Sequence, residues 1–153
     1  MGNIVKVKDM KYVRTDTDAE CRALEDAAER ARRAKSGKEL AGIREEVTTR
    51  AKHIQTMSSL CYIRFTLNTR DEFYLAEKEY YDEHLPELSA AGAKFNRAFL
   101  ASPHLKEALE LMNPNVAKVY ELALKVTDDK IVPDMAEEAA LVTEYDRLMS
   151  EMD

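Results

Sequence analysis

The chain has 153 residues, of which 45% are hydrophobic, and it contains only four glycines and four prolines. This length fits one domain with a core of its own, the hydrophobic content excludes a disordered chain, and the shortage of turn residues disfavours an all-β fold. The 23 basic and 29 acidic residues give a net charge of −6, which argues against a nucleic-acid-binding protein. We therefore expect an all-α fold.

Residues 1–15 are expected to form an extended lead-in to the first helix. The chain shows no basic start followed by an apolar stretch, so no signal peptide is predicted. No apolar run approaches the roughly 18 residues that a membrane-spanning helix needs. We expect a cytoplasmic protein without a membrane partner, in which Cys21 and Cys61 are reduced core residues.

The pattern of residues 16–68 predicts an antiparallel hairpin of two helices. Residues 16–18 offer N-cap side chains, and an alanine-rich stripe of helical period follows them: Leu24, Ala27, Ala28, Ala31 and Ala34. Ser36 and Gly37 interrupt this helix. The second stripe repeats close to every 3.5 residues: Leu40, Ile43, Val47, Ala51, Ile54, Met57, Cys61 and Phe65.

The second helix, over residues 38–68, is the longest that the sequence predicts. At 1.5 Å per residue it would be roughly 45 Å long, whereas a compact domain of this size has a diameter of about 40 Å. We therefore expect the hairpin to project from the rest of the chain.

Residues 69–153 are expected to form a bundle of about four further helices. Thr69 and Glu72 form a capping box at the start of the first of them. Its apolar face continues across Pro86, so we expect a kink or brief break near His84 and Leu85. That face consists of Phe73, Tyr80 or Tyr81, Leu85, Leu88, Gly92, Phe95 and Phe99.

Three shorter helices are predicted after this one. Ser102 is the expected N-cap of a helix with Pro103 as its first residue, and Asn113 gives the same signal for the next helix. Residues 127–129 cap the last helix, with Pro133 in its first turn. Its expected core stripe is Val132, Met135, Ala139, Val142, Tyr145 or Asp146, and Met149. We expect the lead-in, hairpin and bundle to form one structural unit.

No catalytic, metal-binding or cofactor-binding residue is predicted. The histidines His53, His84 and His104 lack the i, i+4 spacing of a zinc-binding pair, and the sequence contains no HExxH motif. We interpret them as solvent-facing or locally hydrogen-bonded residues. The two cysteines do not form a CxxC motif, so neither redox chemistry nor a zinc ribbon is indicated.

Three further clusters have structural interpretations. The carboxylates between residues 71 and 87 lack the ExxH pairs of a di-iron bundle and indicate a solvated acidic face. A basic run complements the end of the first helix but has no interleaved aromatics for base stacking: Arg30, Arg32, Arg33, Lys35 and Lys38. An aromatic set could line a peptide groove, although we favour a core role: Phe65, Phe73, Tyr74, Tyr80 and Tyr81.

Several segments together suggest a family. They are residues 9–14 (DMKYVR), 62–74 (YIRFTLNTRDEFY), 79–83 (EYYDE), 95–103 (FNRAFLASP), 131–138 (IVPDMAEE) and 141–145 (LVTEY). In this order and spacing they resemble the N-terminal helical region of oligoendopeptidase F-like zinc metallopeptidases, which are relatives of thimet oligopeptidase. The resemblance covers essentially the whole chain.

The resemblance implies a longer, cytosolic parent enzyme that cuts short peptides in a channel between helical halves. Its zinc would be held by an HExxH helix and a downstream Glu in a C-terminal catalytic part that this sequence lacks. This chain would then be inactive alone and would form a wall or rim of the channel. Its expected partners are the catalytic part, the oligopeptide substrate in the full enzyme, and further copies of itself through exposed apolar surface. The alternative is a free-standing helical module that binds a partner protein.

Overall fold

The computed structural model describes residues 6–126 and 132–151, and within them every regular element is a helix. This confirms the all-α prediction. A short 3-10 helix, η1, precedes six α-helices, and the bounds are η1 Val7–Asp9, α1 Thr17–Arg33, α2 Gly37–Leu67, α3 Glu72–Leu100, α4 Leu105–Glu110, α5 Asn115–Val126 and α6 Val132–Glu151.

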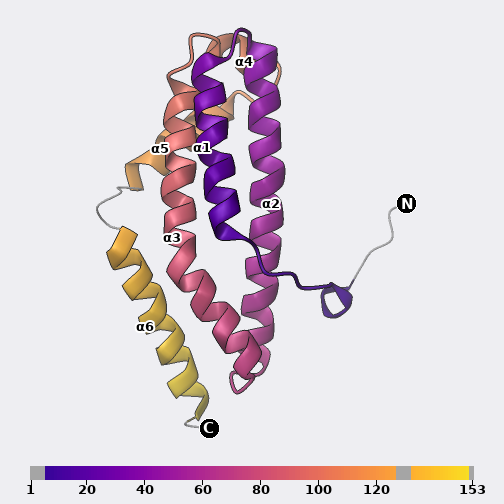
Figure 1. Cartoon of the computed structure of the whole chain (residues 1–153), viewed down its shortest axis with the longest axis vertical. Helices are drawn as coiled ribbons and strands as arrows, with labels where there is room; N and C mark the ends of the chain where they lie inside the picture. The colour runs from indigo at the N-terminus through magenta and orange to yellow at the C-terminus, as the bar shows by residue number, and fades with distance from the viewer. Residues whose placement is uncertain (1–5, 127–131, 152–153) are drawn as a thin grey trace.

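Helices α1, α2 and α3 lie side by side and form the body of the molecule (Figure 1). The first two are antiparallel neighbours, as the sequence predicts. The prediction that the hairpin projects from the bundle is wrong, because α3 is nearly as long as α2 and packs along both α1 and α2. The contact of α1 with α3 is more extensive than its contact with α2. The length of α2 is therefore matched by a partner helix.

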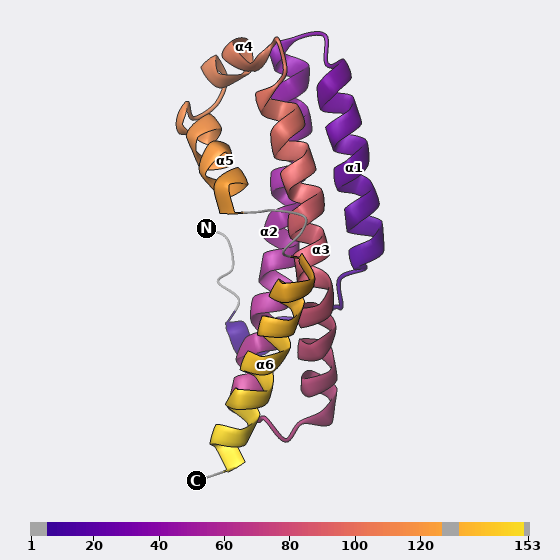
Figure 2. The same ribbon diagram turned by 90° about the vertical axis from the view of Figure 1, so that its left-hand side faces the viewer.

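The main core lies at the end of the bundle where α1 meets α2. Here the predicted alanine stripe of α1 is buried, which lets the neighbouring helices approach closely. Helices α4 and α5 cover this end (Figure 2). The buried residues of this cluster are Ala27, Ala28, Ala31, Ala34, Leu40, Ile43, Phe95, Ala98, Phe99, Ala108 and Val116.

Helix α1 starts at the predicted capping signal, and helix α2 has a cap at Ser36, which the sequence analysis took only as an interruption. The Asp16 carboxylate accepts a hydrogen bond from the Ala19 backbone N–H at 2.9 Å, and the Ser36 hydroxyl accepts from Glu39 N–H at 3.2 Å. These side chains satisfy backbone donors that the first helical turn leaves without partners.

The prediction of a capping box formed by Thr69 and Glu72 is wrong. Residues 68–71 form a turn, closed by the hydrogen bond from Asp71 N–H to the Asn68 carbonyl at 3.1 Å. Helix α3 therefore begins at Glu72 with Asp71 as its N-cap, while the Thr69 hydroxyl lies 2.6 Å from the Ser150 hydroxyl of α6.

The predicted start of α4 is also too early. The helix begins at Leu105 with His104 as its N-cap residue, so neither Ser102 nor Pro103 has its expected position. The Ser102 hydroxyl instead accepts from His104 N–H at 3.3 Å within the preceding turn. Before α5, the Asn113 side chain accepts from Asn115 N–H at 2.9 Å, as expected of a capping residue, but the helix begins at Asn115, one residue after the predicted Pro114.

Helix α3 continues through Pro86 without a break. The ribbon bends near the middle of the helix (Figure 1), where this proline removes one backbone donor and its ring crowds the preceding turn. The prediction of a kink is confirmed, and the helix does not reverse direction.

Helix α6 packs along the half of α3 that α1 leaves uncovered (Figures 1 and 2). Pro133 lies in its first turn, as predicted, whereas the predicted cap at residues 127–129 lies outside the described residues. The predicted core stripe is wrong over its second half, because Val142, Tyr145 and Met149 are exposed, whereas Met135 and Ala139 are half-buried. Instead, the buried Thr143 faces α3.

Candidate functional site

The three histidines lie apart, and each has a local environment. His53 is exposed on α2. The His84 ring stacks on Tyr80 with centroids 4.3 Å apart, and its Nδ1 lies 2.8 Å from the Tyr80 carbonyl oxygen. The His104 Nδ1 lies 3.6 Å from the Glu107 carboxylate. These contacts agree with the interpretation of solvent-facing or locally hydrogen-bonded residues.

The residues that the structure describes offer no donor set for the zinc ion that the resemblance implies for the parent enzyme. Within residues 6–126 and 132–151, no three His, Cys, Asp or Glu side chains form a group that could hold a metal. Cys61 is buried, as predicted for a core residue, and Cys21 is half-buried; both are free thiols. Burial raises the pKa of the Cys61 thiol to about 11.

The acidic segment of α3 is not the uniformly solvated face that the sequence predicted. Its side chains at positions 72, 79, 83 and 87 are exposed, but Glu77 and Asp82 are buried. Each buried carboxylate has a cationic and a hydroxyl partner from elsewhere in the fold, which compensates for the loss of hydration.

Glu77 is held by residues 10–16, the segment between η1 and α1, which we call the strap. The Tyr12 hydroxyl donates to its carboxylate, and Arg14 Nε lies 3.0 Å from both carboxylate oxygens. The Arg14 guanidinium lowers the pKa of Glu77, against the opposing effect of burial. Burial and, next, the hydrogen bond to Glu77 raise the pKa of Tyr12. The strap therefore carries an ion pair and a neutral phenol at pH 7.

The predicted aromatic set divides between the core and the strap. Phe65 and Tyr81 are fully buried, which confirms the core interpretation for them, whereas Phe73 is exposed. The Tyr81 hydroxyl accepts from Thr15 N–H at 3.3 Å, and the Tyr80 hydroxyl donates to the Thr15 carbonyl at 3.0 Å. The tyrosines of α3 thus fix the path of the strap.

Part of the basic run at the end of α1 is paired with neighbouring carboxylates. Arg30 pairs with Glu46 of α2 at 2.8 Å, and Arg32 pairs with Glu29 one turn earlier. These exposed pairs contribute little stability, and they offset part of the positive charge at this end of the helix.

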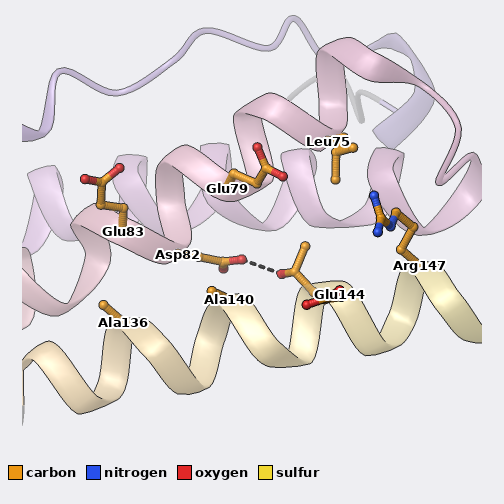
Figure 3. A pocket seen from close by; sticks show the side chains of 9 residues that line it. Leu75, Glu79, Asp82, Glu83, Ala136, Ala140, Glu144 and Arg147 are labelled. Atoms are coloured by element: carbon orange, nitrogen blue, oxygen red, sulfur yellow. Dashed lines mark hydrogen bonds between the residues drawn. The ribbon is translucent and has the colours of Figure 1, made fainter.

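A polar cluster joins α3 to α6. Lys78 forms an ion pair with Asp82 and lies 2.8 Å from the Thr143 hydroxyl, which donates to the other Asp82 oxygen. The dashed line in Figure 3 marks the contact between α3 and α6. Because all three side chains are largely buried, this cluster fixes the register of α6 on α3.

A cavity of about 450 Å³ lies beside this cluster, between α3 and α6 (Figure 3). Glu79, Glu83 and Glu144 are exposed around it, and Arg147 lies at one end of it. The rest of the lining is Leu75, Asp82, Ala136, Ala140 and Thr143. Solvated carboxylates and small apolar residues do not identify a ligand, and we assign none to this cavity.

Helices α5 and α6 each carry several exposed apolar residues on their outward faces. Their exposed large hydrophobic residues are Val119, Leu122, Val126, Leu141, Val142, Tyr145, Leu148 and Met149. A shallow groove of about 440 Å³ on α6 is bordered by three acidic residues, Asp134, Glu137 and Glu138. Exposed apolar residues that cluster in this way mark interaction surfaces. In the described part of the chain, no helix has the length and apolarity to cross a bilayer.

Comparisons with known proteins agree with the resemblance seen in the sequence. The family model described as peptidase M3 N-terminal domain matches residues 7–127, while a search of curated proteins gives no match. A crystal structure assigned as oligoendopeptidase F from Bacillus anthracis strain Ames has a TM-score of 0.86 and 28% identity. A structure of PZ peptidase A with an inhibitor has a TM-score of 0.85 and 26% identity.

These matches cover almost all of this chain and a small part of the relatives. The Bacillus anthracis match covers 94% of this chain and 26% of the other, and the PZ peptidase A match covers 92% and 25%. The chain therefore spans about a quarter of the length of these solved structures. Because the family model covers most of the sequence, the chain belongs to the family of peptidase M3 N-terminal domains.

Proposed function

We propose that the chain serves as the non-catalytic N-terminal domain of a zinc-dependent oligoendopeptidase and forms part of the wall of a channel for short peptides. The observation that carries this proposal is the match of 92–94% of this chain to only 25–26% of the two peptidase structures. The remaining three quarters of such an enzyme would supply the zinc ligands and the catalytic residues.

The donor chemistry of the described residues supports an inactive domain. A catalytic zinc site needs three protein ligands and an open position for water, and no suitable group of side chains lies in the described part of the chain. We therefore expect no peptide hydrolysis by this chain alone, and we derive no catalytic step from it.

The outward faces of α5 and α6 support docking onto a larger body. Their apolar residues, such as Val142 and Tyr145, are exposed in the isolated chain, and burying them would be favourable. The acidic residues beside them would suit a partner surface with basic residues at its edge. In the absence of that partner, we expect this surface to bind a hydrophobic dye or to self-associate.

A chimera tests the proposal. This chain replaces the matching quarter of the Bacillus anthracis protein, and zinc-dependent hydrolysis of a quenched oligopeptide is compared with that of the same protein lacking this quarter. We expect the chimera to cleave at least tenfold faster than the truncated protein. Val142→Asp with Tyr145→Asp should remove most of that gain, whereas Thr49→Asp, at an exposed position on α2, should retain it.

Two results would overturn the proposal. The first is a chimera no more active than the truncated protein although both are folded. The second is chelator-sensitive peptide hydrolysis by the purified 153-residue chain. A free-standing interaction module, in contrast, would leave the chimera inactive and the isolated chain monomeric without dye binding.

A further inference from the structure

A groove of about 550 Å³ runs along the middle of α2. It lies where the apolar stripe of this helix is least covered: Val47 and Ile54 are half-buried and Ala51 is exposed, although Leu40 and Phe65 near the two ends of the stripe are fully buried. The opposite apolar lining is Leu24 of α1, Leu85, Leu88 and Phe95 of α3, and Tyr120 of α5.

Arg44 distinguishes this groove from an ordinary packing gap. It lines the groove, and its Nε is buried without a hydrogen-bond partner. A buried guanidinium N–H without an acceptor is unfavourable, and each such group in a folded protein calls for an explanation. Because this Nε has almost no accessible surface, an oxygen atom of a bound molecule would satisfy it only after a small movement of the Arg44 side chain.

The charges around the groove favour an anionic molecule. Its charged lining residues are Arg44, Arg50, Lys52 and Glu20, and Arg50 is already paired with Glu20 at 3.1 Å. The lining is therefore positive within a chain of net charge −6. The side-chain amides of Gln55 and Asn96 also line the groove, where they could bond to peptide groups.

We propose that this groove binds the C-terminal residue of a peptide, with the Arg44 guanidinium donating to the terminal carboxylate and the apolar side chain lying among the leucines of α3. A guanidinium recognises a carboxylate by charge-assisted hydrogen bonds, and the apolar walls favour a bulky terminal residue. The choice of a peptide as the source of the carboxylate rests on the proposed function. The required chemistry, an apolar group that ends in a carboxylate, is read from the groove itself.

The absence of tryptophan from this chain allows a direct binding test. The probe is the peptide acetyl-Gly-Gly-Trp-Leu, prepared as the free acid and as the C-terminal amide, and its Trp fluorescence anisotropy is followed as the purified 153-residue chain is added. We expect the acid to bind at least tenfold more tightly than the amide.

Two variants and a control locate the site. Arg44→Gln should abolish the preference for the acid, whereas Arg70→Gln, at an exposed position between α2 and α3, should keep it. Gly92 lines the groove, and a Cβ at this position meets no atom within 4 Å. Gly92→Leu should therefore fill the groove and weaken the binding of acid and amide alike, which keeps the proposal testable if Arg44→Gln does not fold.

Equal binding of acid and amide, or an unchanged preference in folded Arg44→Gln, would overturn the proposal. Binding of laurate with no binding of the peptide acid would overturn the peptide as the ligand. The titration uses the chain alone, so its failure is distinguishable from failure of the chimera, which tests docking to the catalytic part.

Discussion

The contact between the strap and α3 predicts an unequal response to the loss of two arginines. Arg14→Ala removes the cationic partner of Glu77, whose side chain is only 4% exposed, while Arg14 itself is 51% exposed. Arg30→Ala removes a comparable partner of Glu46, but that pair is 45% and 57% exposed. The two substitutions therefore compare the same chemistry at different burial.

The expected cost of Arg14→Ala is about 2 kcal/mol. A hydrogen bond to a charged group contributes roughly 1.5–3 kcal/mol, and we take the lower part of this range because water reaches the exposed Arg14 and screens it. Glu77 keeps the hydrogen bond from Tyr12, so its loss of partners is incomplete. For a chain of this length, this cost lowers Tm by about 4–8 °C.

Urea denaturation followed by circular dichroism measures both variants. With a slope of about 2 kcal/mol per molar urea, Arg14→Ala should shift the midpoint by about 1 M. Arg30→Ala should cost under about 1 kcal/mol, because exposed ion pairs contribute little. Equal costs for the two substitutions would refute the argument that burial of Glu77 gives the strap its stabilising effect.

The same pair gives a pH dependence of defined sign. The pKa of Glu77 is lowered in the folded state, mainly by Arg14. Its contribution is therefore fully present above the ordinary pKa of a glutamate, about 4.3, and is lost as pH falls through the lowered value. The difference in stability between the native chain and Arg14→Ala should be constant from pH 7 to pH 5 and should shrink in more acidic solution.

Two further predictions concern packing and thiol reactivity. A Cβ on Gly37 would lie 2.5 Å from the Ala108 backbone nitrogen, whereas a Cβ on Gly42 meets nothing within 4 Å. Gly37→Ala should therefore lower the free energy of unfolding by about 1–3 kcal/mol. Gly42→Ala should raise it by about 0.5–1 kcal/mol, and thermal denaturation measures both changes. Native Cys61, buried and with its thiol pKa raised to about 11, should be alkylated more slowly at pH 8 than the half-buried Cys21, and urea should remove the difference. Equal rates in the native state would contradict this prediction.

The sequence predicts the helical body well because its apolar periodicity is strong and local. The alanine stripe of α1 is buried along its length, and α2 begins and ends within one residue of the prediction. The starts of α3 and α4 were missed because several residues near each start can cap a helix. Thr69 and Asp71 compete in this way, and only the turn at residues 68–71 decides between them.

The candidate site residues were harder to predict because their partners are distant in sequence. Arg14 is 63 residues from Glu77, and Asp82 is 61 residues from Thr143. No spacing rule within one helix reveals such pairs, so the sequence alone predicts a solvated surface for the carboxylates between residues 71 and 87. The strap gave one usable signal, since Tyr12 and Arg14 lie in one of the segments that resemble the peptidase family.

The failure of the predicted stripe on α6 has a different cause. Apolar residues at helical spacing predict burial, and the period on α6 is correct, yet Val142, Tyr145 and Met149 face outward. The opposite face is fixed to α3 by the buried hydrogen bond from Thr143 to Asp82, so α6 cannot turn its apolar side inward without leaving a buried carboxylate poorly paired. If α6 docks as we propose, the apolar residues on its outward face are buried against the rest of a longer peptidase, which explains their helical spacing. The double substitution at positions 142 and 145 then tests fold and assembly separately, because it should lower the activity of the chimera while leaving the thermal stability of the isolated chain within about 0.5 kcal/mol of its original value.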